Sequence, residues 1–206
     1  MVKFEKNHLK AIIIVHGKSE KQICEYIKSK LRLRLEIYAD KNGEKSIQIT
    51  SVMRTLENSI FKTKEKFLTY FQDAAQIKGR KAQLEIWSDE FRIFIIMDTD
   101  DCTENEANQF KTKEMFKKHW AYEYIVPIWN YPNLEEVLVQ AKIPFKKRGE
   151  ARKSEYIKLF PTNGKYAESE KVELEVFKNN LMKIRDTNMS DFIDFCLKSA
   201  VLLTIK

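Results

Sequence analysis

Residues 91–97 form the apolar run Phe-Arg-Ile-Phe-Ile-Ile-Met, and the carboxylates of Asp98, Asp100 and Asp101 follow it within four residues. An apolar run of this length, rich in Ile and Phe, is typical of a buried strand. Asp98 and Asp100 are two positions apart, so an extended backbone directs both side chains to the same side. Like charges held this close repel each other unless a cation neutralises them, and hard cations such as Mg²⁺ take oxygen ligands. The segment therefore predicts a metal site at the end of a buried strand.

The composition is that of one globular domain, or of one domain with a small appendage, because the chain has 206 residues, of which 43% are hydrophobic and 33% charged. Its three cysteines, Cys24, Cys102 and Cys196, are far apart and form no CxxC pair, so we expect reduced thiols in a cytoplasmic protein. The apolar runs are too short to span a bilayer, and the charged N-terminus has no signal-peptide core. We therefore expect no membrane partner.

The net charge of +7 is unevenly distributed and permits a polyanionic partner. One basic cluster within residues 142–153 comprises Lys142, Lys146, Lys147, Arg148, Arg152 and Lys153. A second comprises Lys28, Lys30, Arg32 and Arg34. Such clusters are either a solvated face or a track that contacts the phosphate backbone of a nucleic acid.

The first half of the chain reads as a strand, a tight exit at Gly17-Lys18 and a helix. Leu9–Val15 is the strand, and Ser19 with Gln22 suggests a capping box at the helix start. Two extended stretches, Leu33–Tyr38 and Ile47–Met53, flank an Asn-Gly turn, either as a hairpin or as one strand with a loop. Leu56–Ala75 has the periodicity of one long helix.

The second half continues the alternation after the acidic strand. The expected elements are a helix over Thr103–Trp120, a strand over Tyr124–Trp129, a helix capped by Asn133 and a mostly helical region over 145–206. The apolar stretch Phe192–Ile205 could pack internally or across a dimer, and internal packing is the favoured interpretation. The predicted architecture is an α/β domain over 1–141, with a mainly parallel sheet sandwiched by helices, and a basic helical C-terminal extension over 142–206 packed on it.

Parallel strands place their carboxyl ends along one edge of the sheet, where such sheets bind ligands. The predicted strand ends therefore bring together three groups of side chains that are distant in sequence: His16 with Glu20, Asp98 with Asp100, and Asn133 with Glu135. An alternative for each acid is structural. Asp98 and Asp100 can cap a helix or turn, and Glu20 and Glu135 occupy first helical turns, where acids are favoured.

Val15-His16-Gly17-Lys18-Ser19-Glu20, together with Asp98-Thr99-Asp100, resembles the two signatures of the Toprim fold. The resemblance covers about residues 9–140 and is strongest to the OLD and RloB-like branch, whose members often serve in phage defence or abortive infection beside an ATPase. Asn133-Leu134-Glu135-Glu136 is similar to a downstream acidic element of those proteins. The resemblance implies a Toprim-like fold, a nucleic-acid substrate and a companion ATPase as a possible partner.

One residue departs from the family pattern, because the first signature normally reads Val-Glu-Gly and here His16 replaces the Glu. Three interpretations are open. Activity is lost and a binding module remains; or His16 serves as acid or base, since imidazole exchanges protons near neutral pH; or His16 ligates a softer metal such as Mn²⁺.

The favoured function is a divalent-metal-dependent nuclease of Toprim type, and the alternative is a catalytically degenerate module that binds nucleic acid or a partner ATPase. The expected cofactor is Mg²⁺ or Mn²⁺, held by Glu20, Asp98, Asp100 and Glu135. The expected catalytic residues are His16, Glu20, Asp98 and Asp100. The expected nucleic-acid contacts are Lys18 and the basic cluster of Lys142, Lys146, Lys147, Arg148, Arg152 and Lys153.

Overall fold

A computed structural model describes residues 9–74, 90–143 and 167–202 of the chain. Its centre is a four-stranded sheet in the order β2-β1-β3-β4, in which all neighbouring strands are parallel. The strands are β1 (Ala11–Val15), β2 (Leu35–Tyr38), β3 (Arg92–Asp98) and β4 (Ile125–Asn130). The predicted α/β class with a parallel sheet is confirmed and is consistent with a Toprim-like arrangement.

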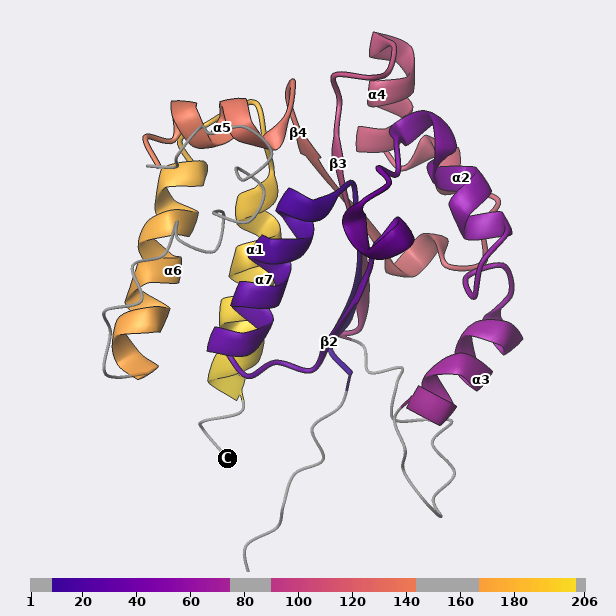
Figure 1. Cartoon of the computed structure of the whole chain (residues 1–206), viewed down its shortest axis with the longest axis horizontal. Helices are drawn as coiled ribbons and strands as arrows, with labels where there is room; N and C mark the ends of the chain where they lie inside the picture. Colours follow the sequence, from indigo (N-terminus) through magenta and orange to yellow (C-terminus); the bar gives the residue numbers. More distant parts are fainter. Residues whose placement is uncertain (1–8, 75–89, 144–166, 203–206) are drawn as a thin grey trace, which may run out of the picture.

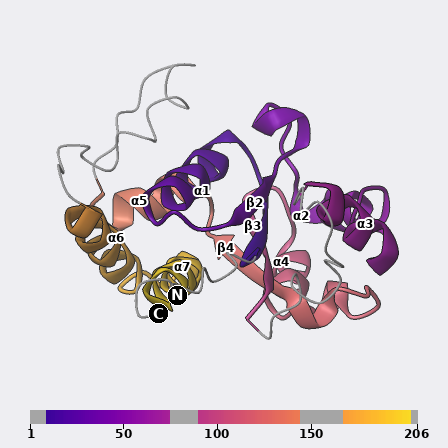
Figure 2. The same ribbon diagram turned by 90° about the horizontal axis from the view of Figure 1, so that it is seen from below.

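Helices cover both faces of this sheet (Figures 1 and 2). One layer contains α1 (Lys18–Lys30), α5 (Leu134–Gln140), α6 (Ala167–Leu181) and α7 (Met189–Leu202). The other contains α2 (Ile49–Glu57), α3 (Lys64–Ala74) and α4 (Glu104–Lys111). Short 3₁₀ turns occupy Asp40–Gly43, Glu114–Phe116 and Tyr122–Tyr124. Within the described ranges, no helix has the length and apolar character needed to cross a bilayer.

Side-chain alternation along the strands divides the interior into two cores. Ala11, Ile13 and Val15 face the α1/α7 side, whereas Ile12 and Ile14 face the α2/α4 side. Both faces are apolar because helices cover both, which is why these strands read as continuous hydrophobic runs rather than as alternating ones.

Helix α7 belongs to the first of these cores. Phe192, Ile193 and Leu197 are almost fully buried, and the ring centroids of Phe192 and Phe94 of β3 lie 5.1 Å apart. The prediction that the apolar C-terminal stretch packs internally is confirmed for these residues. The boundary between a domain over 1–141 and an extension over 142–206 stays a prediction.

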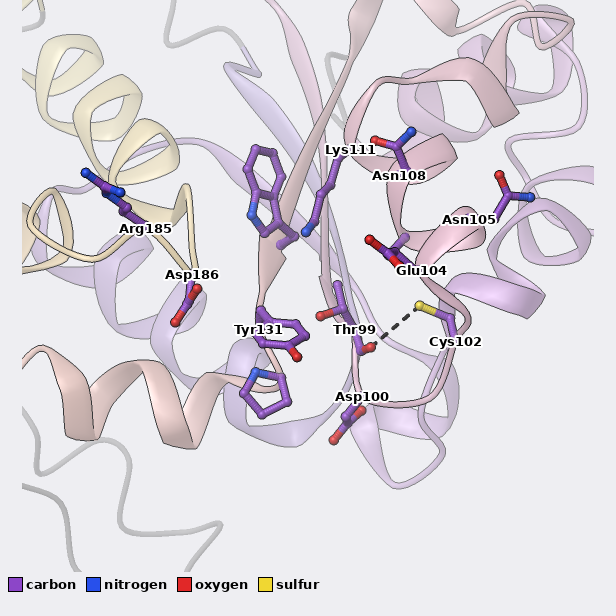
Figure 3. A pocket seen from close by; sticks show the side chains of 13 residues that line it. Thr99, Asp100, Cys102, Glu104, Asn105, Asn108, Lys111, Tyr131, Arg185 and Asp186 are labelled. Atoms are coloured by element: carbon purple, nitrogen blue, oxygen red, sulfur yellow. Dashed lines mark hydrogen bonds between the residues drawn. The ribbon is translucent and has the colours of Figure 1, made fainter.

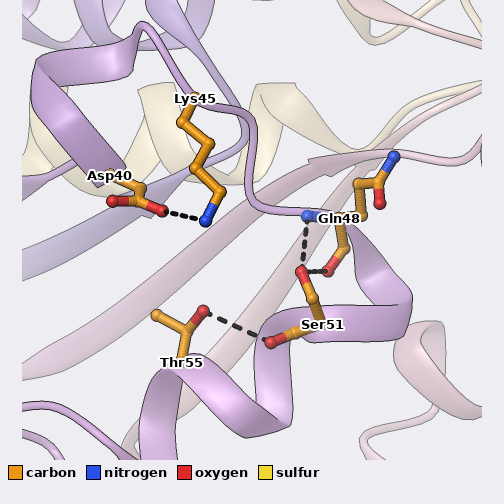
Figure 4. Close-up of polar contacts among 5 residues, drawn as sticks. All are labelled: Asp40, Lys45, Gln48, Ser51 and Thr55. Carbon is orange, nitrogen blue, oxygen red and sulfur yellow. Dashed lines mark hydrogen bonds and ion pairs between the residues drawn. The ribbon is translucent and has the colours of Figure 1, made fainter.

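The expectation of an extended stretch over Ile47–Met53 is wrong, because α2 begins at Ile49. The open choice around Asn42-Gly43 is resolved as one strand with a loop. β-branched residues favour strands, but Ile49, Val52 and Leu56 are buried at helical spacing. The helix start is held locally, since the Gln48 backbone N–H donates to Ser51 Oγ at 3.1 Å (Figure 4).

The single helix expected over Leu56–Ala75 is divided into α2 and α3. Short polar side chains cause the break, since they offer the backbone alternative hydrogen bonds. Asn58 Nδ2 donates to Arg54 O at 2.9 Å at the end of α2. Thr63 Oγ1 accepts the Lys66 N–H at 3.2 Å at the start of α3.

The helix expected to run from Thr103 to Trp120 is also shorter, although its start is confirmed. Thr103 caps α4 and exchanges hydrogen bonds with Glu106. The helix ends at Lys111 because Lys113 adopts a left-handed backbone conformation with φ of 65°.

Candidate functional site

The strand register aligns the carboxyl ends of β1, β3 and β4 along one edge, here called the carboxyl edge. Val15 is opposite Ile96, and Asp98 is opposite Asn130. The next residue along β1, His16, donates its backbone N–H to Ile96 O at 2.8 Å. Three strands therefore deliver His16, Asp98 and Asn130 to neighbouring positions.

Asp98 is the most strongly perturbed carboxyl group of this edge. It is only 5% exposed, and its Oδ1 accepts hydrogen bonds from Asn130 Nδ2 at 3.3 Å and Leu134 N at 3.1 Å. Burial, followed by repulsion from Glu20, Glu135 and Asp100, raises the pKa of Asp98 to about 9, against the lowering effect of the Asn130 hydrogen bond. The fold therefore holds a carboxyl group where its negative charge is unfavourable.

Glu20 is the second buried acid, with 2% of its surface exposed. The expected capping box of Ser19 and Gln22 is wrong: Gly17 is the N-cap, α1 begins at Lys18, and Glu20 Oε2 accepts the Gly17 N–H at 2.9 Å. In a capping box the side chain three residues after the N-cap accepts the N-cap backbone N–H, and here that side chain is Glu20. Gln22 lies five residues after Gly17 and cannot make this bond. Burial raises the pKa of Glu20, and Glu135 adds to this, whereas the charge of His16 opposes it.

Glu135 and Asp100 complete an acidic cluster with Glu20 and Asp98. Asn133 caps α5 as predicted, since its Oδ1 accepts the Glu136 N–H at 3.1 Å. The Asn133 Nδ2 donates to Asp100 Oδ2 at 3.4 Å, which ties α5 to the loop after β3. The structure thus brings together the four acids expected at this edge. Asp98 and Glu20 are buried, Glu135 is half-buried and Asp100 is exposed.

His16 lies between the acidic cluster and the loop that precedes α4. Its charge lowers the pKa of Glu20 and of Asp101, although burial holds both pKa values above their ordinary range. Among the described residues, His16 Nδ1 and Asp101 Oδ1 are buried without a hydrogen-bond partner. These two atoms are polar groups that a ligand or an ion can satisfy.

The residues present fit a hard divalent cation by charge and donor type. Glu20 and Asp98 form no ion pair with a lysine or arginine in the described ranges. Buried carboxylates without a positive partner are stabilised by a bound cation, and oxygen donors suit Mg²⁺ and Mn²⁺. The described residues contain no group of three or more His, Cys, Asp or Glu side chains already close enough to coordinate one ion.

The structure describes only two of the basic residues that were expected to contact nucleic acid. Lys18 is exposed on the first turn of α1, directly at the carboxyl edge, and Lys142 is exposed after α5. The remaining members of the cluster lie outside the described residues: Lys146, Lys147, Arg148, Arg152 and Lys153.

Sequence reasoning missed Asn130 and did not include Asp101 among the expected site residues. Asn130 is fully buried, and its Oδ1 accepts the Thr187 Oγ1 hydroxyl at 2.9 Å while its Nδ2 donates to Asp98. A buried strand that ends in a polar residue would have pointed to Asn130. The predicted strand ended at Trp129, however, and so left Asn130 outside it. Asp101 reads as an acid near a helix start until the fold places it beside His16.

Gly43 supports this site from the 3₁₀ turn after β2. Its φ is +90°, and a Cβ there would lie 3.0 Å from Lys18 Cα and 3.2 Å from Lys18 N. We expect Gly43→Ala to lower the free energy of unfolding by about 1–2 kcal/mol, because the left-handed backbone and the close contact both disfavour a side chain. Urea unfolding measures this, with Gly17→Ala as the control, since a Cβ at Gly17 meets nothing closer than 3.5 Å. Equal stability of Gly43→Ala and the wild type would contradict the tight packing of this turn.

Comparisons with protein-family models, curated proteins and solved structures found no match to this chain. The relation to Toprim proteins therefore remains a prediction from the motifs Val15–Glu20 and Asp98–Asp100.

Proposed function

We propose that the carboxyl edge is a divalent-metal site of Toprim type that cleaves phosphodiester bonds in nucleic acid. One observation carries this proposal. Among the described residues, the fold buries Asp98 beside Glu20 and Glu135 with no lysine or arginine paired to it, and this arrangement raises the pKa of Asp98 to about 9. Such strain is typical of functional sites, because a structural role would not require several acids to converge.

The ion would be Mg²⁺ or Mn²⁺, with Asp98 and Glu20 as the inner ligands and Asp100 and Glu135 as further oxygen donors. When bound, it would activate water and stabilise charge on the phosphoryl oxygens. The hydrogen bonds from Asn130 Nδ2 and Leu134 N fix Asp98 Oδ1 and leave Oδ2 outside these two bonds. The Asn133 amide orients Asp100 in the same manner from the start of α5.

His16 would move a proton at Nδ1. That atom is buried without a hydrogen-bond partner in the described structure, and the ring lies near the carboxyl groups of Glu20 and Asp101. Lys18, exposed at the same edge, would contact a phosphate next to the scissile one.

A second candidate is a non-catalytic module that binds nucleic acid or a partner ATPase. The presence of His16 where the family pattern has Glu favours this alternative, as does the engagement of Asp98 Oδ1 by two protein donors. The acidic cluster would then hold an ion for structure alone.

The test of the first candidate is cleavage of short labelled oligonucleotides in Mg²⁺ or Mn²⁺. Asp98→Asn should lower the rate about a thousandfold, because it removes the charge on which the ion depends while keeping the side-chain shape. Asp191→Asn, at an exposed position in the first turn of α7, is the matched control and should cleave like the wild type. Unchanged cleavage in Asp98→Asn would overturn the mechanism.

His16→Glu separates the two candidates. If the wild type is inactive and His16→Glu creates metal-dependent cleavage, the natural protein is a degenerate enzyme. If the wild type cleaves and His16→Glu lowers the rate, His16 contributes to catalysis.

A further inference from the structure

A hollow of about 1160 Å³ adjoins the acidic cluster on the side of α4 (Figure 3). Its walls come from α4, the end of β4 and the segment between α6 and α7, and its lining includes Thr99 and Asp100. We call it the α4–β4 groove. It is larger than a typical small-molecule pocket of about 300–1,000 Å³, so it has room for a segment of a polymer.

The groove presents aromatic side chains next to a lysine ammonium group. Tyr131 is 55% exposed although its side chain is a large aromatic ring. Trp129, the last residue but one of β4, also lines the groove. Lys111 Nζ lies 5.6 Å from the Trp129 ring centroid and 6.0 Å from that of Tyr131. The two rings therefore hold the ammonium group in the groove by cation–π attraction.

Neither cation of the groove is neutralised within the described structure. Lys111 and Arg185 have no carboxylate within ion-pair distance among the described residues. Figure 3 shows Lys111 extending into the groove near Tyr131, with Asp100 at the end that joins the acidic cluster. An anion bound by Lys111 would thus lie in the same groove as Asp100 of the acidic cluster.

The mixed charge of the lining decides between forms of nucleic acid. Glu104, Asp186 and Asp100 carry three negative charges against the two cations, so the groove does not offer the continuous positive track that a duplex backbone requires. One or two phosphates and a base fit better. Bases in a duplex are already stacked, whereas an unpaired base has a free face for an aromatic side chain.

We propose that the α4–β4 groove binds single-stranded nucleic acid beside the scissile phosphate, with an unpaired base stacked on Tyr131 and a phosphate contacted by Lys111. This inference rests on the proposed function, since it names the form of the substrate for the same edge. Arg185 contacts the next phosphate away from the acidic cluster. The groove therefore selects single strands over duplexes.

The test is fluorescence anisotropy with a labelled oligothymidylate and a duplex of the same length, in a chelator so that no cleavage occurs. The wild type should bind the single strand more tightly than the duplex. Tyr131→Ala should weaken single-strand binding about tenfold through lost stacking. Lys111→Gln should weaken it and reduce the slope of log K against log salt by about 0.7, the value for one phosphate contact on a single strand.

Matched controls lie on α3, outside the groove lining. Tyr70→Ala removes a ring that is 51% exposed, and Lys66→Gln removes one exposed charge. Both variants should bind like the wild type. Thermal unfolding of every variant shows whether a loss of binding reflects a loss of fold.

Binding and cleavage assays together keep this inference distinct from the proposed function. Metal-dependent cleavage with normal single-strand binding in Tyr131→Ala and Lys111→Gln would overturn the groove assignment alone. Loss of binding in these variants without any cleavage by the wild type would overturn the proposed function and retain the groove as a nucleic-acid site. Failure of the wild type to bind the single strand at low salt, or equal affinity for the duplex, would also overturn the groove assignment.

Discussion

Asp98→Asn is expected to raise the free energy of unfolding of the metal-free protein at pH 8 by about 2 kcal/mol, because folding forces the buried Asp98 carboxyl group to keep a proton that it releases in the unfolded chain, whereas an amide carries no such cost. The new amide keeps an oxygen at the position of Oδ1, so the hydrogen bonds from Asn130 Nδ2 and Leu134 N persist. Its NH₂ group can also donate to neighbouring carboxylates. Chemical unfolding in the presence of a chelator measures the difference.

The difference should depend on pH with a definite sign. The pKa of Asp98 is about 9 in the folded protein, and that of an unfolded aspartate is about 4. Between these values the folded state binds more protons, so the wild type loses stability as pH rises. The contribution of Asp98 is fully present below pH of about 4 and is lost as pH approaches 9.

The advantage of Asp98→Asn should therefore be small near pH 4, grow with pH and level off above about 9. Asp98→Ala is the informative contrast, because it removes the acceptor of two buried donors and should be less stable than Asp98→Asn at every pH. A wild type more stable than Asp98→Asn at pH 8 without metal would show that Asp98 is not strained.

Phe192→Ala is expected to lower the free energy of unfolding by about 3–5 kcal/mol, the usual range for removing a buried phenyl ring. Phe192 is fully buried in α7, and its ring contacts that of Phe94 on β3 in an edge-to-face arrangement. The variant should still unfold in a single cooperative transition, but at a lower urea concentration, because α7 and the sheet share one core.

Urea unfolding followed by circular dichroism measures this loss, with Val176→Ala as the control. Val176 lies on α6 and is 54% exposed, so its truncation should change the stability by less than about 0.5 kcal/mol. A second, separate transition in Phe192→Ala would contradict the shared core and indicate that α6 and α7 unfold as an independent unit.

The sequence predicted the strands better than the helices. Strands such as Ile93–Met97 are buried on both faces, so their apolar runs are unambiguous. Helix ends depend on local competition that composition alone does not reveal. The hydrogen bond from Asn58 Nδ2 to Arg54 O and the left-handed backbone at Lys113 each accompany the end of a helix that is shorter than its periodicity suggested.

The convergence at the carboxyl edge was predictable because it follows from parallel topology and needs no side-chain detail. Glu20, Asp98 and Glu135 are distant in sequence, yet each lies at a strand end or shortly after one. The role of Asn130 and the α4–β4 groove were not predictable, because both depend on contacts with the segment between α6 and α7. Thr187 reaches Asn130, and Arg185 lines the groove.

Isothermal titration calorimetry of the wild type with Mg²⁺ and with Mn²⁺ tests the central claim most directly. The account predicts saturable binding in the wild type and in Asp191→Asn, and none in Asp98→Asn or in the double variant Asp98→Ala/Asp100→Ala. Binding of neither ion by the wild type, both alone and with a short oligonucleotide present, would contradict a metal site at the carboxyl edge. Undiminished binding in Asp98→Asn would contradict it equally.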